Sequence, residues 1–205
     1  MTSSMGRAFA EFCQEAEVDP ELFKTVIAEA YGGADPDGMV ALVERGLMPI
    51  GEFEVLLAER LSTGRAAGPL DPSSLRDRLF AGMEADPAMV EAAARARAAG
   101  IMTALVSNSW GTGAYERERF PELFDAVVVS GEVGLRKPEP EIFLEAATRV
   151  GVEPIECVFV DDLLHNVEGA RAVGMEAFVH RSAEFTVPRL ESLFGVRLGS
   201  DTGTK

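Results

Sequence analysis

The pattern that most constrains this chain begins near residue 86, where short apolar runs alternate with amphipathic helices. The spacing predicts a helix from Ala88 to Ala99 and two later helices, Glu141–Val150 and Leu163–Val173. Four strands are expected between and around them, at Ile101–Val106, Ala126–Val129, Cys157–Val160 and Glu176–Val179. Short apolar strands that alternate with helices are typical of a parallel, doubly wound α/β sheet.

Polar side chains follow two of these strands, where sheets of this kind place their sites. Ser107 and Asn108 come directly after the first strand. A hydroxyl beside the free amides of a helix start suits a phosphate oxygen, and an ordinary helix cap is the alternative. Lys137 lies in a later loop that two prolines stiffen, so its ammonium is expected to be held in place, with Arg136 as an alternative.

A third polar signal is the pair Asp161-Asp162, which ends an apolar strand. Two adjacent carboxylates raise each other's pKa, and a bound divalent cation removes that conflict. Mg²⁺ prefers such hard oxygen ligands, whereas an Asp cap on the next helix is the simpler alternative. Asn166, four residues after Asp162, shares its helix face.

The intervals between these signals strengthen the argument. From Ser107 to Lys137 is 30 positions, and from Lys137 to Asp161 is 24. Each interval is about the length of one strand–helix unit, so the hydroxyl, the ammonium and the carboxylate pair are expected at one edge of one sheet.

The first eighty residues read as helices with apolar stripes, which predicts a helical bundle core. We therefore expect a helical domain at 1–85, an α/β domain at 86–199 and a disordered tail at 200–205. Trp110 directly follows the first polar signal, and a buried core position is a simpler account of it than a pocket wall.

Composition excludes several classes of function. The net charge of −15 and the pI of about 4.6 disfavour nucleic acid and anionic membranes as partners. Only Cys13 and Cys157 are present, with two histidines, so neither zinc nor a disulfide framework is expected, and a reducing cytoplasm fits. No apolar run approaches the ~18 residues of a membrane span, and no leader is indicated. The oligomeric state cannot be read from the sequence.

The ordered set of signals resembles the haloacid dehalogenase superfamily, which consists mostly of Mg²⁺-dependent phosphatases that work through an aspartyl-phosphate. Leu105–Asn108 resembles its second motif, Gly134–Phe143 its third, and Asp161–Gly174 its fourth. The helical segment resembles the cap that the family inserts between its first and second motifs. The resemblance implies a Rossmann-like core with an inserted all-helical cap, as in the phosphatase-like branch that includes the amino-terminal domain of soluble epoxide hydrolases.

The resemblance also implies roles for single residues. Ser107 and Asn108 would contact the phosphoryl group of a phosphorylated small molecule, and Lys137 would clamp it. Asp162 would bind Mg²⁺ directly, and Asp161 would bind it directly or through water. A further residue, Asn166 on the following helix, would support the site.

The family's first motif, an apolar strand that ends in the nucleophilic Asp, is missing from the sequence. The first acidic residues, Glu11 and Asp19, belong to the helical segment. Residues 1–4 are interpreted as the tail of a truncated first motif, with roughly ten to fifteen residues absent, one strand and its turn. A misplaced start codon and a true start here both remain open. The absent strand would be flanked by those that carry Ser107 and Asp161, so the chain as written is expected to fold poorly and to lack phosphatase turnover.

The sequence leaves three alternative functions. A non-catalytic homologue that binds a phosphorylated small molecule or a protein partner is compatible with the missing nucleophile. A haloacid dehalogenase needs no metal, and the adjacent acids speak against it. A phospho-signalling receiver domain is disfavoured because its acidic pair comes first in the sequence, whereas Asp161-Asp162 comes last.

Overall fold

The computed structural model describes residues 5–30, 38–63, 68–81, 83–111 and 117–199, and it divides the chain into two compact units. The helical unit comprises Thr2–Glu84 and Ser109–Gly113, and the α/β unit comprises Ala85–Asn108 and the chain from Ala114 onward. The expected boundary near residue 85 is close to this division, but the assignment of Ser109–Gly113 to the helical unit was not expected. The expected tail at 200–205 and the expected motif remnant at 1–4 lie outside the described residues.

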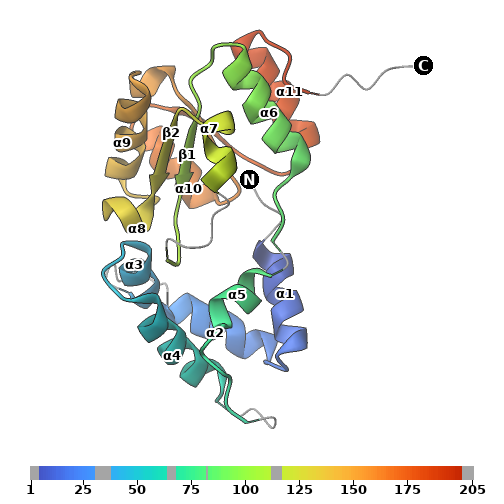
Figure 1. Ribbon diagram of the computed structural model, residues 1–205, viewed down its shortest axis with the longest axis vertical. Coiled ribbons are helices and arrows are strands. Elements are labelled where there is room, and N and C mark those ends of the chain that lie inside the picture. The colour runs from blue at the N-terminus through green and yellow to red at the C-terminus, as the bar shows by residue number, and fades with distance from the viewer. Residues whose placement is uncertain (1–4, 31–37, 64–67, 82, 112–116, 200–205) are drawn as a thin grey trace, which may run out of the picture. The chain divides into compact units, whose positions relative to one another are not determined.

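The described residues of the helical unit form five helices (Figure 1), namely α1 (Met5–Glu15), α2 (Pro20–Ala30), α3 (Met39–Glu44), α4 (Ile50–Leu61) and α5 (Leu75–Phe80). The start of α2 illustrates why they form here. Pro20 occupies the first helical position, and the Asp19 carboxylate accepts a 2.9 Å hydrogen bond from the Glu21 N–H. On α4, Phe53, Leu57 and Leu61 recur at helical spacing and are fully buried.

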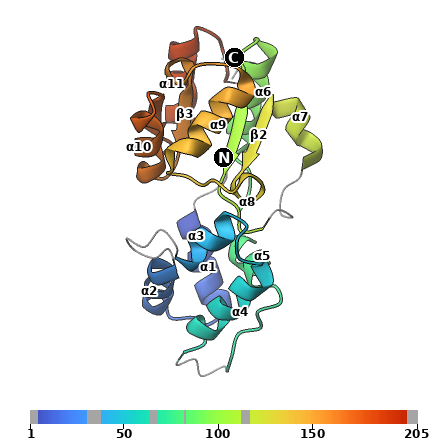
Figure 2. The same cartoon turned by 90° about the vertical axis from the view of Figure 1, so that its left-hand side faces the viewer.

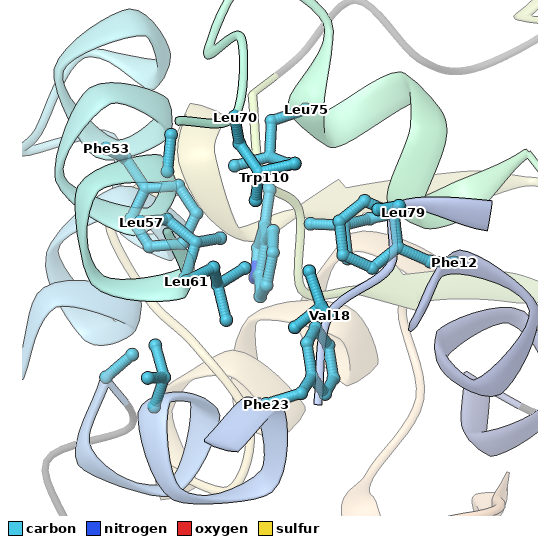
Figure 3. Close-up of a cluster of buried hydrophobic side chains, with 14 of the residues drawn as sticks. Phe12, Val18, Phe23, Phe53, Leu57, Leu61, Leu70, Leu75, Leu79 and Trp110 are labelled. Atoms are coloured by element: carbon cyan, nitrogen blue, oxygen red, sulfur yellow. The ribbon is translucent and has the colours of Figure 1, made fainter. Parts of the chain in front are cut away.

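Trp110 lies within the core of the helical unit (Figure 3). Its ring centroid is 4.8 Å from that of Phe53 and 5.2 Å from that of Phe80, both in edge-on arrangements. The residue is buried, which confirms the expectation of a core tryptophan. This packing explains why Ser109–Gly113 belongs to the helical unit.

The α/β unit contains four short strands, β1 (Ala104–Ser107), β2 (Ala126–Val129), β3 (Val158–Asp161) and β4 (Glu176–Val179). Its α-helices and 3₁₀ turns are α6 (Pro87–Ala98), η1 (Arg117–Arg119), α7 (Phe120–Leu123), α8 (Ser130–Val133), α9 (Pro140–Val150), η2 (Pro154–Glu156), α10 (Leu164–Ala172) and α11 (Ala183–Phe194). Among the described residues, no helix has the length and apolar character needed to span a bilayer.

The strands form two parallel pairs, β1 with β2 and β3 with β4. α9 packs on β1 and β2, α10 packs on β3 and β4, and the two helices lie side by side (Figure 2). One apolar cluster, with Val106, Val128 and Phe159 among its members, joins both pairs to these helices. The expected α/β fold with parallel strands is therefore confirmed. Within the described residues, however, the sheet is not continuous, because β1 and β3 are not paired with each other.

The first strand begins later than expected because its start is used for other bonds. The Thr103 N–H donates to the Asp125 carboxylate at 2.9 Å, and the Thr103 carbonyl accepts from the Asp125 N–H at 2.8 Å. α11 was not expected. It packs against α6 in a separate apolar cluster that contains Met89 and Val187.

Candidate active site

The end of β3 holds a buried carboxylate, that of Asp161. Its side chain is 7% exposed, and its Oδ2 accepts a 2.8 Å hydrogen bond from Lys137 Nζ. Its Oδ1 accepts two more, at 2.9 Å from the Leu163 N–H and at 2.9 Å from Asn166 Nδ2. Both oxygens are therefore engaged by donors from the loop and from α10, as a buried carboxylate requires.

Lys137 is held at both of its ends. Its main-chain N–H donates to Asn108 Oδ1 at 2.8 Å, and its main-chain carbonyl accepts from Asn108 Nδ2 at 3.0 Å. Its ammonium donates to the Val106 carbonyl at 3.1 Å as well as to Asp161. An ammonium has three N–H donors, so one remains for a further acceptor. The Nζ also lies 5.9 Å from the centroid of the Phe159 ring.

Close packing fixes the loop that carries Lys137 against α10. A Cβ atom added at Gly169 would lie 2.5 Å from the Pro138 carbonyl oxygen and 3.0 Å from the Phe143 ring. Only glycine permits this approach without a shift of the loop. Gly169 thus positions Lys137 indirectly, through Pro138.

The balance of charge keeps Asp161 ionised. Burial is the largest single influence on the pKa of Asp161 and raises it. The charge of Lys137 and the hydrogen bonds from Lys137, Asn166 and the Leu163 N–H together outweigh burial, so this pKa lies below its ordinary value of 3.8. The site therefore contains a buried ion pair rather than a neutral acid and a lysine.

The remaining residues that the sequence predicted for this site lie next to the ion pair. Ser107 ends β1, and its hydroxyl donates to the Asn108 carbonyl at a long 3.3 Å. Asp162 is exposed, whereas Asn166 is 2% exposed on α10. Hydrogen bonds therefore connect five of the six predicted residues, and the sixth, Asp162, is the chain neighbour of Asp161.

The oxygen atoms of the site match the ligands that Mg²⁺ prefers. Among the described residues, no three acidic, histidine or cysteine side chains cluster closely enough to hold a metal by themselves. Asp162 nevertheless offers an exposed carboxylate, and Asn166 Oδ1 is buried with no hydrogen-bond partner. Mg²⁺ commonly binds through one or two carboxylates and takes its other oxygens from water and phosphate. The donor set therefore fits this ion.

Two features of the site were not foreseen from the sequence. One is the Val106 carbonyl as an acceptor for the lysine, and the other is the bidentate contact of the Asn108 amide with the main chain of Lys137. Neither has a sequence signal, since both depend on how two segments about 30 positions apart meet. The structure also shows that the contact with Asp161 is made by Lys137, and Arg136 is not its partner.

Parallel strands that end at Ser107 and Asp161, a lysine that donates hydrogen bonds to Val106 and Asp161, and a separate helical unit define an α/β protein with a helical insertion. The sequence profile of the haloacid dehalogenase-like hydrolases matches residues 6–174. The chain belongs to this family.

Individual relatives agree with this assignment. Bifunctional epoxide hydrolase 2 of Rattus norvegicus is 26% identical over 175 residues, which cover 79% of this chain and 32% of that protein. A phosphatase of Mycobacterium tuberculosis is 34% identical over 149 residues, 66% of this chain and 64% of the relative. The chain thus spans only about a third of the length of the epoxide hydrolase.

A solved structure supports the fold. An enzyme of the same family from Bacteroides thetaiotaomicron, crystallised as a magnesium complex, superposes with a TM-score of 0.60 at 19% identity. The superposition covers 84% of this chain and 91% of that one.

Proposed function

We propose that this chain has the phosphate site of a Mg²⁺-dependent phosphoric-monoester hydrolase and binds the phosphoryl group of a phosphorylated small molecule at the ends of β1 and β3. The observation that carries this proposal is the buried ion pair between Lys137 and Asp161, which are 2.8 Å apart. A buried pair is costly to build, so its position at the carboxyl ends of parallel strands favours a binding role.

The residues of this chain have different roles in the proposed site. The unused N–H of the Lys137 ammonium donates to a phosphoryl oxygen, and the Ser107 hydroxyl donates to another. Asp161 and Asn108 hold the lysine, so that its charge is in place before the ligand arrives. Asn108 is therefore a positioning residue in this proposal, because its side chain binds the main chain of Lys137. Its predicted contact with phosphate could come only from its backbone.

Mg²⁺ would be held by the Asp162 carboxylate, with Asn166 Oδ1 and Asp161 close by in the chain. When bound, the ion neutralises charge on the phosphoryl oxygens. This chain's own part is to supply the oxygen ligands and to hold the lysine in place through Asp161 and the Val106 carbonyl.

Asp161 offers no open oxygen for attack on phosphorus, and Asp162 is assigned to Mg²⁺ in this proposal. Both oxygens of Asp161 already accept hydrogen bonds, and the residue is buried. An attacking carboxylate needs an open oxygen, so we propose that the chain as given binds phosphate without turnover. The same observation favours a second candidate, a binding protein for a phosphorylated small molecule. We give the dehalogenase less weight, because its chemistry leaves the adjacent acids without a role.

The test measures phosphate binding and turnover separately. Inorganic phosphate is titrated with and without Mg²⁺ and followed by ³¹P line broadening, and release of p-nitrophenol from p-nitrophenyl phosphate reports turnover. Binding should be strengthened by Mg²⁺ and lost in Lys137→Met, whereas Lys24→Met, at an exposed lysine on α2, should bind normally.

Lys137→Met leaves the Asp161 charge buried without a partner and could unfold the chain. A second variant therefore separates loss of binding from loss of folding. Lys137→Met combined with Asp161→Asn should fold like the parent and still fail to bind phosphate. Normal phosphate affinity in this double variant would refute the site. Turnover by the chain as given would refute the absence of a nucleophile.

A further inference from the structure

The outer edge of β2 carries a carbonyl that is bound by an arginine. The Ala126 N–H donates to the Thr103 carbonyl at 3.2 Å, so the polar groups of Ala126 are directed toward β1. A parallel ladder uses the groups of alternate residues on each side, and the N–H and carbonyl of Val127 therefore point away from β1. This outward carbonyl accepts a 2.8 Å hydrogen bond from Arg149 Nη1.

β4 has the same arrangement on its own outer edge. The Glu176 N–H donates to the Cys157 carbonyl at 3.0 Å, so the polar groups of Ala177 point away from β3. The Ala177 carbonyl accepts two hydrogen bonds from Arg171, at 2.9 Å from Nε and at 2.6 Å from Nη2. In the part of the chain that the structure describes, no further strand pairs with β2 or β4 on these edges.

The two arginines occupy matching positions. Arg149 is the last residue but one of α9, and Arg171 is the last residue but one of α10. Each binds the second residue of a four-residue edge strand. A basic side chain in the last turn is favoured by the helix dipole, which accounts for the residue type. It does not account for both guanidinium groups lying on outward strand carbonyls.

Each edge would otherwise suit the addition of a strand from another molecule. β2 reads Ala-Val-Val-Val, and β4 contains Ala177, Phe178 and Val179, so both are rich in the apolar β-branched or aromatic residues of strands that associate. Edges of this kind are commonly blocked by charged side chains. A guanidinium on the outward carbonyl removes an acceptor, and an incoming strand would have to displace and desolvate the charge.

We propose that Arg149 and Arg171 close the outer edges of β2 and β4 against strand addition by a second copy of this chain. A second copy is the partner of these edges because it offers the same edge in return, and like edges pair with two-fold symmetry as antiparallel strands. The net charge of −15 opposes the encounter of two copies at long range, whereas the arginines act on the contact itself. Phosphate binding has no part in this role.

The test replaces each arginine by methionine in the full chain. Methionine keeps a long unbranched side chain without the guanidinium, and the substitution makes the chain one charge more negative. By charge alone, each variant should associate less than the parent, so the edge contact and the net charge predict opposite signs. Arg7→Met, at an exposed arginine of α1 paired with Glu11, is the control with the same change of charge and no strand carbonyl.

Self-association is measured by sedimentation equilibrium. Arg149→Met and Arg171→Met should each dimerise at least about tenfold more tightly than the parent, because two symmetry-related carbonyls become available. Arg7→Met should sediment like the parent. Arg149→Lys, which keeps a charge at the edge of β2, should do so as well.

Amide hydrogen exchange locates the contact. Dimerisation of Arg149→Met should slow exchange at the Val127 and Val129 N–H groups, which point outward from β2. In Arg171→Met, the slowed groups should be the Ala177 and Val179 N–H on β4. Urea unfolding checks that each variant folds, and alanine replaces methionine at a position where it does not.

Four results would overturn the proposal. They are variants that sediment like the parent, equal association of Arg7→Met, dimers without slowed exchange at the edge amides, and a parent chain that is already dimeric with these amides protected. Association of one edge variant alone would keep the role for that edge and overturn it for the other.

Discussion

Gly169→Ala tests the packing that positions the lysine loop. The added Cβ would lie 2.5 Å from the Pro138 carbonyl oxygen, which would have to retreat by about 0.9 Å to reach the 3.4 Å of an ordinary contact. Overpacking of this kind costs about 1–3 kcal/mol. Against it stands a gain of about 0.4–1 kcal/mol from the lower entropy of the unfolded chain. We therefore expect a net loss of about 1–2 kcal/mol.

Gly51→Ala is the matched control. Gly51 also lies in a helix, α4, and an added Cβ there would meet no atom within 4 Å. The same substitution should therefore stabilise the chain by about 0.4–1 kcal/mol. The sign of the effect, and not only its size, should differ between the two glycines.

The free energy of unfolding is measured in urea by far-UV circular dichroism for both variants. The fluorescence of Trp110, the single tryptophan, follows the helical unit that contains Gly51. Phosphate binding in Gly169→Ala should weaken as well, because Pro138 follows Lys137 directly. The reasoning fails if Gly169→Ala is as stabilising as Gly51→Ala.

Three further substitutions have defined outcomes. Lys137→Met should lower the free energy of unfolding in urea by about 3–5 kcal/mol, because it leaves the Asp161 charge buried without a partner. If the losses of Lys137→Met and Asp161→Asn simply add in the double variant, this reasoning is contradicted. The pKa of Asp125 is lowered, chiefly by a hydrogen bond from the Thr103 N–H. Its stabilising effect is therefore complete above about pH 4 and is lost as the pH falls through the folded pKa. Asp125→Asn should flatten the dependence of the unfolding free energy on acid pH, and an unchanged dependence would contradict this. Trp110→Ala should cost about 3–5 kcal/mol by circular dichroism, whereas Leu47→Ala, at an exposed leucine, should cost little; equal losses would mean that Trp110 is no core residue.

The strands were predicted best where an apolar run has clear ends. β2 and β4 have the expected bounds, Ala126–Val129 and Glu176–Val179, because turn residues flank both. α11 was missed for the opposite reason. It contains Pro188 and exposes Phe185 and Leu193, so that neither the helix rule nor the apolar stripe is clean.

The residues of the candidate site could be proposed from the sequence, but the hydrogen bonds between them could not. The spacing of Lys137 and Asp161, about one strand–helix unit apart, is enough to predict that they meet at one sheet edge. That the Asn108 side chain binds the main chain of Lys137 could not be read from the sequence, because an amide of this kind serves equally well as a helix cap. The roles of these residues in phosphate and metal binding stay predictions.

Among the described residues, β1 and β3 each pair with a strand on one edge only, and this bears on solubility. Unpaired edges are templates for edge-to-edge assembly. The net charge of −15 opposes such aggregation by mutual repulsion between molecules. That repulsion weakens near the pI of about 4.6 and in high salt, so light scattering should rise under both conditions.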